Sequence, residues 1–212
     1  MNLRNALAVS VAALGIALSS STQAALVLDG DFSNPSGGSG FVTYDSGSSI
    51  GPSWQVVTQG SVDLIGGYWR APSLGGGSVD LDGNSPGGIS QTLSLDPGSY
   101  VLSFSLSGNP DGGPGMKSVR ASVGGTAQDF FYTTGANTRA DMKYVTESLA
   151  FTVSGEDSTL LSFLSLDQEG PYGAAIGNVS VSAVPLPPAL PLFAAAVLGI
   201  GAVGFYRRRQ AI

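Results

Sequence analysis

The sequence predicts an all-β protein whose central part folds as one antiparallel β-sandwich of the jelly-roll type. Two observations support this prediction. Apolar and polar residues alternate in segments of about four to nine residues, as in half-buried strands. Between Ala25 and Val184 no stretch keeps helical spacing for three turns, and Gly, Pro, Asn and Asp recur too often to leave room for crossover helices. An immunoglobulin-like sandwich is the second possibility.

About a dozen short strands are expected along the chain. The clearest alternation lies in residues 100–107, where four apolar side chains share one face: Tyr100, Leu102, Phe104 and Leu106. In the segment 160–166, Leu160, Leu164 and Leu166 are expected to share the apolar face. The expected strands, in chain order, are residues 26–28, 41–44, 54–57, 62–65, 79–81, 89–95, 100–107, 119–123, 130–132, 145–153, 160–166 and 179–181.

The composition is consistent with a folded core and excludes several kinds of site. Of the 212 residues 31 are Gly and 12 are Pro, but 42% are hydrophobic, so we interpret the Gly as turns between strands and not as disorder. The chain has no Cys, which excludes disulfides, Cys-ligated zinc and thiol nucleophiles. It has no His, which excludes the Ser-His-Asp triad and His-ligated metals.

Charge is concentrated in the central part of the chain. Residues 25–184 hold five basic and all fifteen acidic residues, a net charge of −10. Such a domain repels nucleic acid and anionic lipid surfaces, but it does not repel divalent cations or neutral sugars. The charge therefore predicts no nucleic-acid partner.

Both ends of the chain have the sequence pattern of targeting segments. Residues 1–24 carry Arg4, an apolar run and small residues at Thr22 and Ala24, the pattern of a secretory signal peptide cleaved after Ala24. Residues 190–206 form an uncharged run that ends in three arginines: Arg207, Arg208 and Arg209. A single transmembrane helix with a cytoplasmic C-terminus is expected, so that residues 25–184 lie outside the membrane.

The C-terminal segment 184–212 resembles the PEP-CTERM sorting tail. The resemblance rests on the Pro-rich signature, the spanning run and the Arg cluster, with the signature reading Val184, Pro185, Leu186 and Pro187. It implies recognition by an exosortase-type processing enzyme in a Gram-negative bacterium. The protein would be anchored in the membrane at first and would then reach the cell surface or extracellular matrix. An anchor that is never cleaved is the simpler alternative.

The middle of the chain, residues 25–183, is similar to the choice-of-anchor C family. The resemblance rests on residues 29–32, 53–57, 60–69, 78–91 and 108–114. It implies a galactose-binding-like jelly roll, related to plant cell-wall proteins of a domain of unknown function, and glycan association without catalysis. Where the family has Asp in its last strand, this chain has Gly177.

The candidate carbohydrate-binding residues combine aromatic rings with polar groups. A sugar ring packs its C–H groups on an aromatic face while polar side chains bind its hydroxyls. Tyr68 and Trp69 are adjacent, so in a strand one would point inward and the other toward solvent. The polar candidates are Asp63, Asn109 and Asp111. Trp54, in an apolar strand, is expected to be a core residue.

A calcium site is the one cofactor that the sequence leaves open. Asp80 and Asp82 are two residues apart on one strand face, beside the Gly-containing turn 83–87, and calcium takes six to eight oxygen ligands. The spacing is not that of an EF-hand loop. Solvated carboxylates at the end of a strand are the simpler interpretation.

These observations favour an exported, non-enzymatic protein that binds polysaccharide, such as the exopolysaccharide of its own cell. A structural or adhesive surface protein without sugar specificity is an alternative, because low charge density and Ser-rich strand faces fit it equally well. A glycoside hydrolase is a weaker alternative, since two carboxylates suffice for that chemistry but any acidic chain supplies such pairs.

Overall fold

The computed structural model describes residues 26–113, 115–155, 158–168 and 170–185. The expected signal peptide and the expected transmembrane helix lie outside these residues, as do Leu186, Pro187 and the three terminal arginines. Within the described residues no helix is long and apolar enough to cross a membrane.

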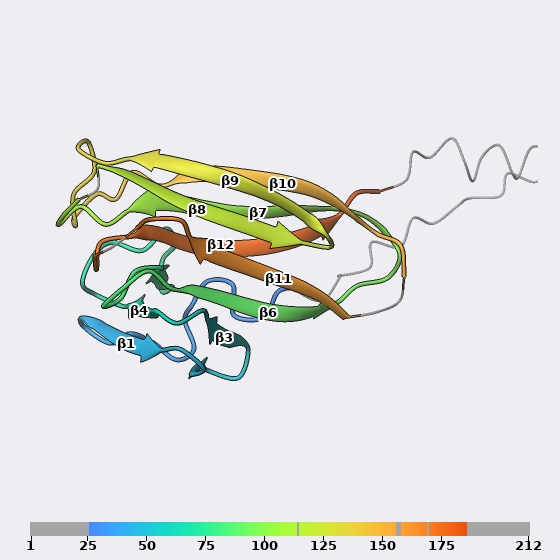
Figure 1. Ribbon diagram of the computed structural model, residues 1–212, viewed down its shortest axis with the longest axis horizontal. Helices are drawn as coiled ribbons and strands as arrows, with labels where there is room; N and C mark the ends of the chain where they lie inside the picture. The colour runs from blue at the N-terminus through green and yellow to red at the C-terminus, as the bar shows by residue number, and fades with distance from the viewer. Residues whose placement is uncertain (1–25, 114, 156–157, 169, 186–212) are drawn as a thin grey trace, which may run out of the picture.

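Two antiparallel six-stranded sheets pack face to face (Figure 1). Sheet A has the order β1 (Phe41–Asp45), β4 (Ser61–Ile65), β5 (Ser78–Asp80), β12 (Ala174–Ala183), β7 (Gly98–Gly108) and β10 (Val145–Val153). Sheet B has the order β2 (Ser49–Ile50), β3 (Trp54–Val57), β6 (Gly88–Ser94), β11 (Ser158–Ser165), β8 (Met116–Val123) and β9 (Thr126–Thr133). The predicted antiparallel sandwich is confirmed.

The strand order is that of a jelly roll. From β5 to β8 each successive strand lies in the other sheet, β8 and β9 form a hairpin in sheet B, and the alternation then continues to β12. The result is β5-β12-β7-β10 facing β6-β11-β8-β9, the arrangement produced by two Greek keys. Strands β1 to β4 extend both sheets on one side. The last strand, β12, runs from the end of the sandwich that carries residues 109–113 to the opposite end, where the Val184 N–H donates to Ser99 O.

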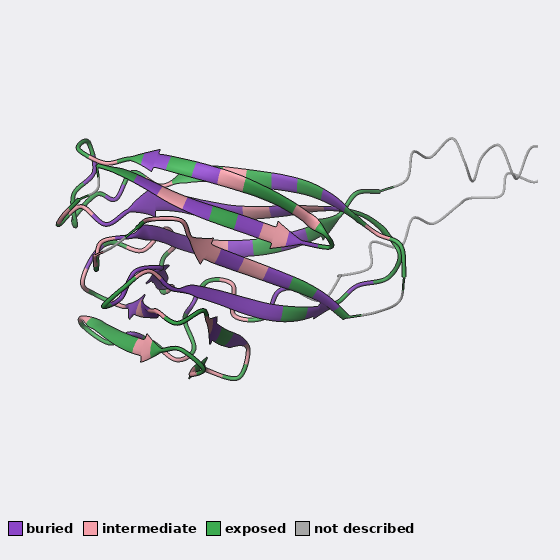
Figure 2. Cartoon of the chain, viewed as in Figure 1, coloured by how far each residue is buried: buried purple, intermediate pink, exposed green. Residues whose placement is uncertain are grey.

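The main core lies between the sheets. In β7 the inward residues Tyr100, Leu102, Phe104 and Leu106 are all buried, as their alternation predicts. Figure 2 shows that buried residues alternate with more exposed ones along the long strand β8 and along the second half of β9. Trp54 is fully buried, which confirms its place in the core.

Three strand predictions were wrong. Residues 26–28 form turns and bends and no strand, and the two-residue strand β2 was not predicted. In β11 the inward side chains are Leu161 and Phe163, whereas Leu160 is 58% exposed. The sequence of this strand is apolar in both phases, so alternation could not decide which face is buried.

A second, smaller apolar layer covers the outer face of sheet A. Its buried members are Ile65, Trp69, Met142 and Ala175, and Tyr68 and Tyr144 pack against them. Trp69 belongs to the segment after β4 and Met142 to the segment between β9 and β10. The Arg70 N–H donates to Arg139 O at 2.8 Å and ties these two segments together. We call this group of six residues the outer layer.

Candidate functional site

A pocket of about 260 Å³ opens on the outer face of sheet A, beside the outer layer. Its lining residues are Phe41, Thr43, Asp63, Ile65, Tyr68, Trp69, Asp80, Gly83, Asn84, Asn109, Asp111, Pro171 and Tyr172. The structure therefore brings together all five residues predicted to bind carbohydrate, with one of the two predicted to bind calcium. Their roles stay predictions.

The floor of the pocket is a row of polar residues set by strand register. Thr43 of β1 pairs with Asp63 of β4, and Asp63 pairs with Asp80 of β5, so the three side chains share one face. The Thr43 hydroxyl donates to Asp63 Oδ1 at 2.6 Å. Burial raises the pKa of Asp63, and the hydrogen bond from Thr43 opposes that shift.

Asp80 is a fully buried anchor beneath the pocket. Its Oδ1 accepts hydrogen bonds from the N–H groups of Asp82 and Gly173, both at 3.0 Å, and its Oδ2 accepts one from Asn109 Nδ2 at 2.7 Å. Burial raises the pKa of Asp80 well above its usual value, although these donors favour the carboxylate. Both oxygens are therefore engaged within the protein.

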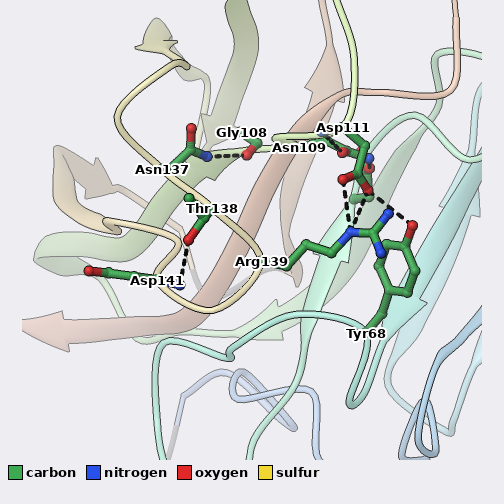
Figure 3. A network of polar contacts seen from close by, with 9 residues as sticks. Tyr68, Gly108, Asn109, Asp111, Asn137, Thr138, Arg139 and Asp141 are labelled. Carbon is green, nitrogen blue, oxygen red and sulfur yellow. Dashed lines mark hydrogen bonds and ion pairs between the residues drawn. The ribbon is translucent and has the colours of Figure 1, made fainter.

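Asn109 connects Asp80 to the rim of the pocket through hydrogen bonds. Its Oδ1 accepts a hydrogen bond from the Asp111 N–H at 2.9 Å, which fixes the turn that presents the Asp111 side chain. The Asp111 carboxylate in turn binds two side chains from other loops. It accepts from the Tyr68 hydroxyl at 3.0 Å and from Arg139 Nε at 2.8 Å (Figure 3).

Arg139 covers one face of the Tyr68 ring. Its guanidinium carbon lies 4.1 Å from the ring centroid, a cation–π contact. The segment that carries Arg139 is held by Asn137, whose Nδ2 donates to Gly108 O at 2.6 Å, and by the backbone pairing of Thr138 with Asp141 (Figure 3). The Tyr68 ring is therefore held between Arg139 and the aromatic side chains of Phe41 and Trp69, and it stays half-buried.

Of the two predicted aromatic residues, only Tyr68 reaches solvent. Trp69 is 3% exposed, and its indole N–H donates to Ser78 Oγ at 2.8 Å, so it supports the pocket from below and offers no ring face for stacking. Phe41, which the sequence analysis did not single out, is 47% exposed and meets Tyr68 edge to face, with centroids 5.1 Å apart. Thr43, Asn84 and Tyr172 were also missed.

A buried lysine ties together the two loops that wall the pocket. Lys117 points inward from β8 and is fully buried; its Nζ donates to Gly112 O at 2.9 Å and to Tyr172 O. Burial lowers the pKa of Lys117, and the charges of Asp167, Asp80 and Asp82 oppose that shift. Gly112 is also packed so closely against the Tyr172 ring that a Cβ there would overlap it. Alternation alone would have assigned an apolar residue to position 117.

Asp82, the second predicted calcium ligand, does not line the pocket. It is fully buried just after β5, and neither of its carboxylate oxygens has a hydrogen-bond partner. The predicted interpretation of Asp80 and Asp82 as solvated carboxylates is wrong, since both are buried. Among the described residues no group of three or more Asp, Glu, Cys or His side chains is placed to hold a metal ion. The calcium prediction stays untested.

No protein-family model matches the sequence. Halomucin from Haloquadratum walsbyi is 30% identical over 168 residues, which cover 76% of this chain but only 2% of halomucin's length. Resemblance to the choice-of-anchor C family and to PEP-CTERM tails therefore stays a prediction.

Several solved structures are similar in fold at low sequence identity. They include a family 35 carbohydrate-binding module from Clostridium thermocellum (14% identity, TM-score 0.45, covering 68% of this chain and 98% of the module). TmCBM61, solved in complex with β-1,4-galactotriose, has 12% identity and a TM-score of 0.48 and covers 76% of this chain and 100% of its own. The CBM22-1 xylan-binding domain of Paenibacillus barcinonensis Xyn10C has 13% identity and a TM-score of 0.44, with coverage of 69% and 95%. These values are too low to say what the present chain binds.

Proposed function

We propose that this chain binds a neutral polysaccharide, without catalysis, in the pocket on the outer face of sheet A. The observation that carries the proposal is the arrangement of an exposed aromatic corner, Phe41 against Tyr68, beside the polar row that includes Asp63. A sugar ring would pack its C–H groups on the aromatic corner and donate its hydroxyls to the carboxylates.

The charge of the pocket supports a neutral ligand. Three carboxylates line it, those of Asp63, Asp80 and Asp111, and one guanidinium, that of Arg139, is bound to Asp111 at its edge. An anionic sugar such as a uronate would meet net negative charge there and lose affinity. A neutral hexose would not.

The arrangement of Asp80 supports binding over hydrolysis. Glycoside hydrolysis requires two carboxyl groups free to act on the glycosidic bond. Asp80 faces Asp63 across the strand pair, but both of its oxygens accept hydrogen bonds from the protein. No reducing sugar should therefore be released from a bound polysaccharide.

The proposal is tested with a glycan array and with pull-down on insoluble neutral and anionic polysaccharides. We expect retention on at least one neutral glycan and a loss of about tenfold or more in affinity for Phe41→Ala, as expected when an aromatic contact is removed. Phe131→Ala is the matched control, because Phe131 is also an exposed strand phenylalanine (56%) but lies in sheet B. Folded protein that binds no glycan would refute the proposal.

Export and anchoring form a second part of the proposed function and rest on the sequence alone. An uncharged run of 17 residues before three arginines would retain the protein in a membrane until the tail is processed, at the cell surface or in the extracellular matrix. Deletion of residues 186–212 should release a soluble exported form. Cell fractionation measures this, and equal membrane retention of both forms would exclude the sorting-tail interpretation.

A further inference from the structure

Three carboxylate oxygens at one end of the sandwich are buried without any hydrogen-bond partner. They are both oxygens of Asp82 and Oδ2 of Asp167. Asp82 is fully buried, and burial of an ionised carboxylate costs several kcal/mol or more unless a charge or donors compensate it. Unsatisfied groups of this kind in a folded protein call for a bound water or ion.

The two aspartates follow strands of different sheets, and hydrogen bonds join their segments: the Ser165 N–H donates to Gly87 O at 2.9 Å, and the Gly87 N–H donates to Leu81 O at 2.8 Å. Asp82 follows β5 of sheet A, and Asp167 follows β11 of sheet B. Burial raises the pKa of Asp82, the Ser165 hydroxyl lowers it, and the negative charge of Asp167 raises it further. Asp167 Oδ1 is held by the Ser118 N–H at 3.0 Å and by the Ser118 hydroxyl at 2.6 Å, which leaves Oδ2 without a partner.

Charge in this cluster does not balance. The groups that interact here are the carboxylates of Asp80, Asp82 and the half-buried Asp167 and the ammonium of Lys117, which carry a formal charge of −2 when all four are ionised. Lys117 directs its ammonium to the carbonyls of Gly112 and Tyr172, and no ion pair within the described residues includes it. A water molecule could satisfy hydrogen bonds here but would leave both negative charges in place.

We propose that the free oxygens of Asp82 and Asp167, with the Ser165 hydroxyl, bind a divalent calcium ion between the two sheets. Calcium prefers carboxylate and other oxygen ligands and accepts irregular geometry, and its two charges neutralise the cluster. Asp80 is excluded as a ligand because the protein already occupies both of its oxygens. The proposed pair is therefore Asp82 with Asp167, and not Asp80 with Asp82.

The site would join two segments that belong to different sheets. It links the end of β5 to the loop after β11, which carries Tyr172 into the pocket wall. Calcium would therefore stabilise the fold and the wall of the pocket together. Calcium binding itself does not depend on whether the pocket binds a sugar.

The test uses the full-length chain, stripped with a chelator, and Ca²⁺ alone as the probe. Isothermal titration calorimetry is expected to show one calcium ion per chain, and the thermal midpoint should rise with calcium concentration because the ion binds only the folded state. The double variant Asp82→Asn/Asp167→Asn should bind calcium roughly 100-fold more weakly or not at all, since fewer ligand charges lower calcium affinity.

Two further measurements keep the test decisive. Asp129→Asn is the matched control, because Asp129 is a partly exposed carboxylate paired with Arg120 on the surface, and it should bind calcium like the wild type. Near-ultraviolet circular dichroism confirms that the double variant is folded. Folded wild-type protein that binds no calcium, or a double variant that binds it normally, would overturn the proposal. Glycan binding is scored separately, so failure of either proposal leaves the other measurable.

Discussion

The main core between the sheets and the outer layer over sheet A are stabilised in different ways. The main core is built mostly from strand residues, with Trp54, Phe104 and Phe163 packed ring against ring. In the outer layer two loop segments pack on the sheet, and beneath them lie buried polar groups such as Asp80, Ser78 and Asn109. The first region depends on apolar packing, and the second combines apolar packing with buried hydrogen bonds.

This difference explains why the pocket belongs to the outer layer. A core filled by rings has no polar groups to offer a ligand, and any cavity in it would be destabilising. Around the pocket, buried donors such as Asn109 and Lys117 hold exposed groups in fixed positions. Such support allows polar side chains to face solvent without losing their geometry.

The largest expected effect is in the main core. Trp54→Ala removes a fully buried ring and its N–H bond to Asp29 O, and should lower the free energy of unfolding by about 3–5 kcal/mol. Phe131→Ala, on an exposed aromatic residue, should change it by less than about 0.5 kcal/mol. Urea unfolding measures both. Equal effects would mean that the main core is not the principal source of stability.

A second experiment tests the cost of the unpaired carboxylate in calcium-free protein. Burial, with the charge of Asp167, raises the pKa of Asp82 to about 6. The folded state then binds more protons than the unfolded one, so stability is highest below about pH 4 and falls as pH rises to 6. Above pH 6 with a chelator, Asp82→Asn should therefore be more stable than the wild type by about 2–3 kcal/mol.

The difference should disappear below about pH 4, where Asp82 is protonated in both states. Thermal midpoints measured from pH 3.5 to 8 check this. If the thermal midpoints of the wild type and the variant changed by the same amount between pH 4 and pH 6, ionisation of Asp82 would not destabilise the folded protein.

A third experiment tests the polar support of the pocket. Lys117→Met keeps the apolar stem but removes the donor to Gly112 O and Tyr172 O, and should lower the free energy of unfolding by about 1–3 kcal/mol and weaken glycan binding. Lys143→Met, at an exposed lysine, should change neither the free energy of unfolding nor the affinity for glycan. If Lys117→Met lowered the free energy of unfolding but left glycan affinity unchanged, the hydrogen bonds of Lys117 would not be needed to form the pocket.

The smallest expected effect concerns β11, the strand for which the sequence predicted the wrong buried face. Leu160→Ala should change stability by less than about 0.5 kcal/mol, because Leu160 is on the outer surface of sheet B. Leu161→Ala, one residue further and fully buried, should cost about 2–4 kcal/mol. The reverse result would place the opposite face of β11 in the core.

Sequence alone predicted most strands because their inward faces are apolar and their outward faces are not, as in β7. It failed in β11, where both faces are apolar, and for β2, which is too short to show a pattern. The five predicted binding residues do line one pocket. Alternation could not find Phe41 as a partner of Tyr68, Asp167 as a neighbour of Asp82, or the inward-pointing Lys117, because these contacts join segments distant in sequence.

The direction of β12 determines how the molecule would be presented when it is tethered. The strand starts beside Asp80 under the pocket and ends at Ala183, about 30 Å away at the usual rise per residue. Any support attached through residues after Pro185 would hold the sandwich by the end remote from the pocket (Figure 1). The pocket on the outer face of sheet A would then lie in the part of the sandwich farther from the attachment point.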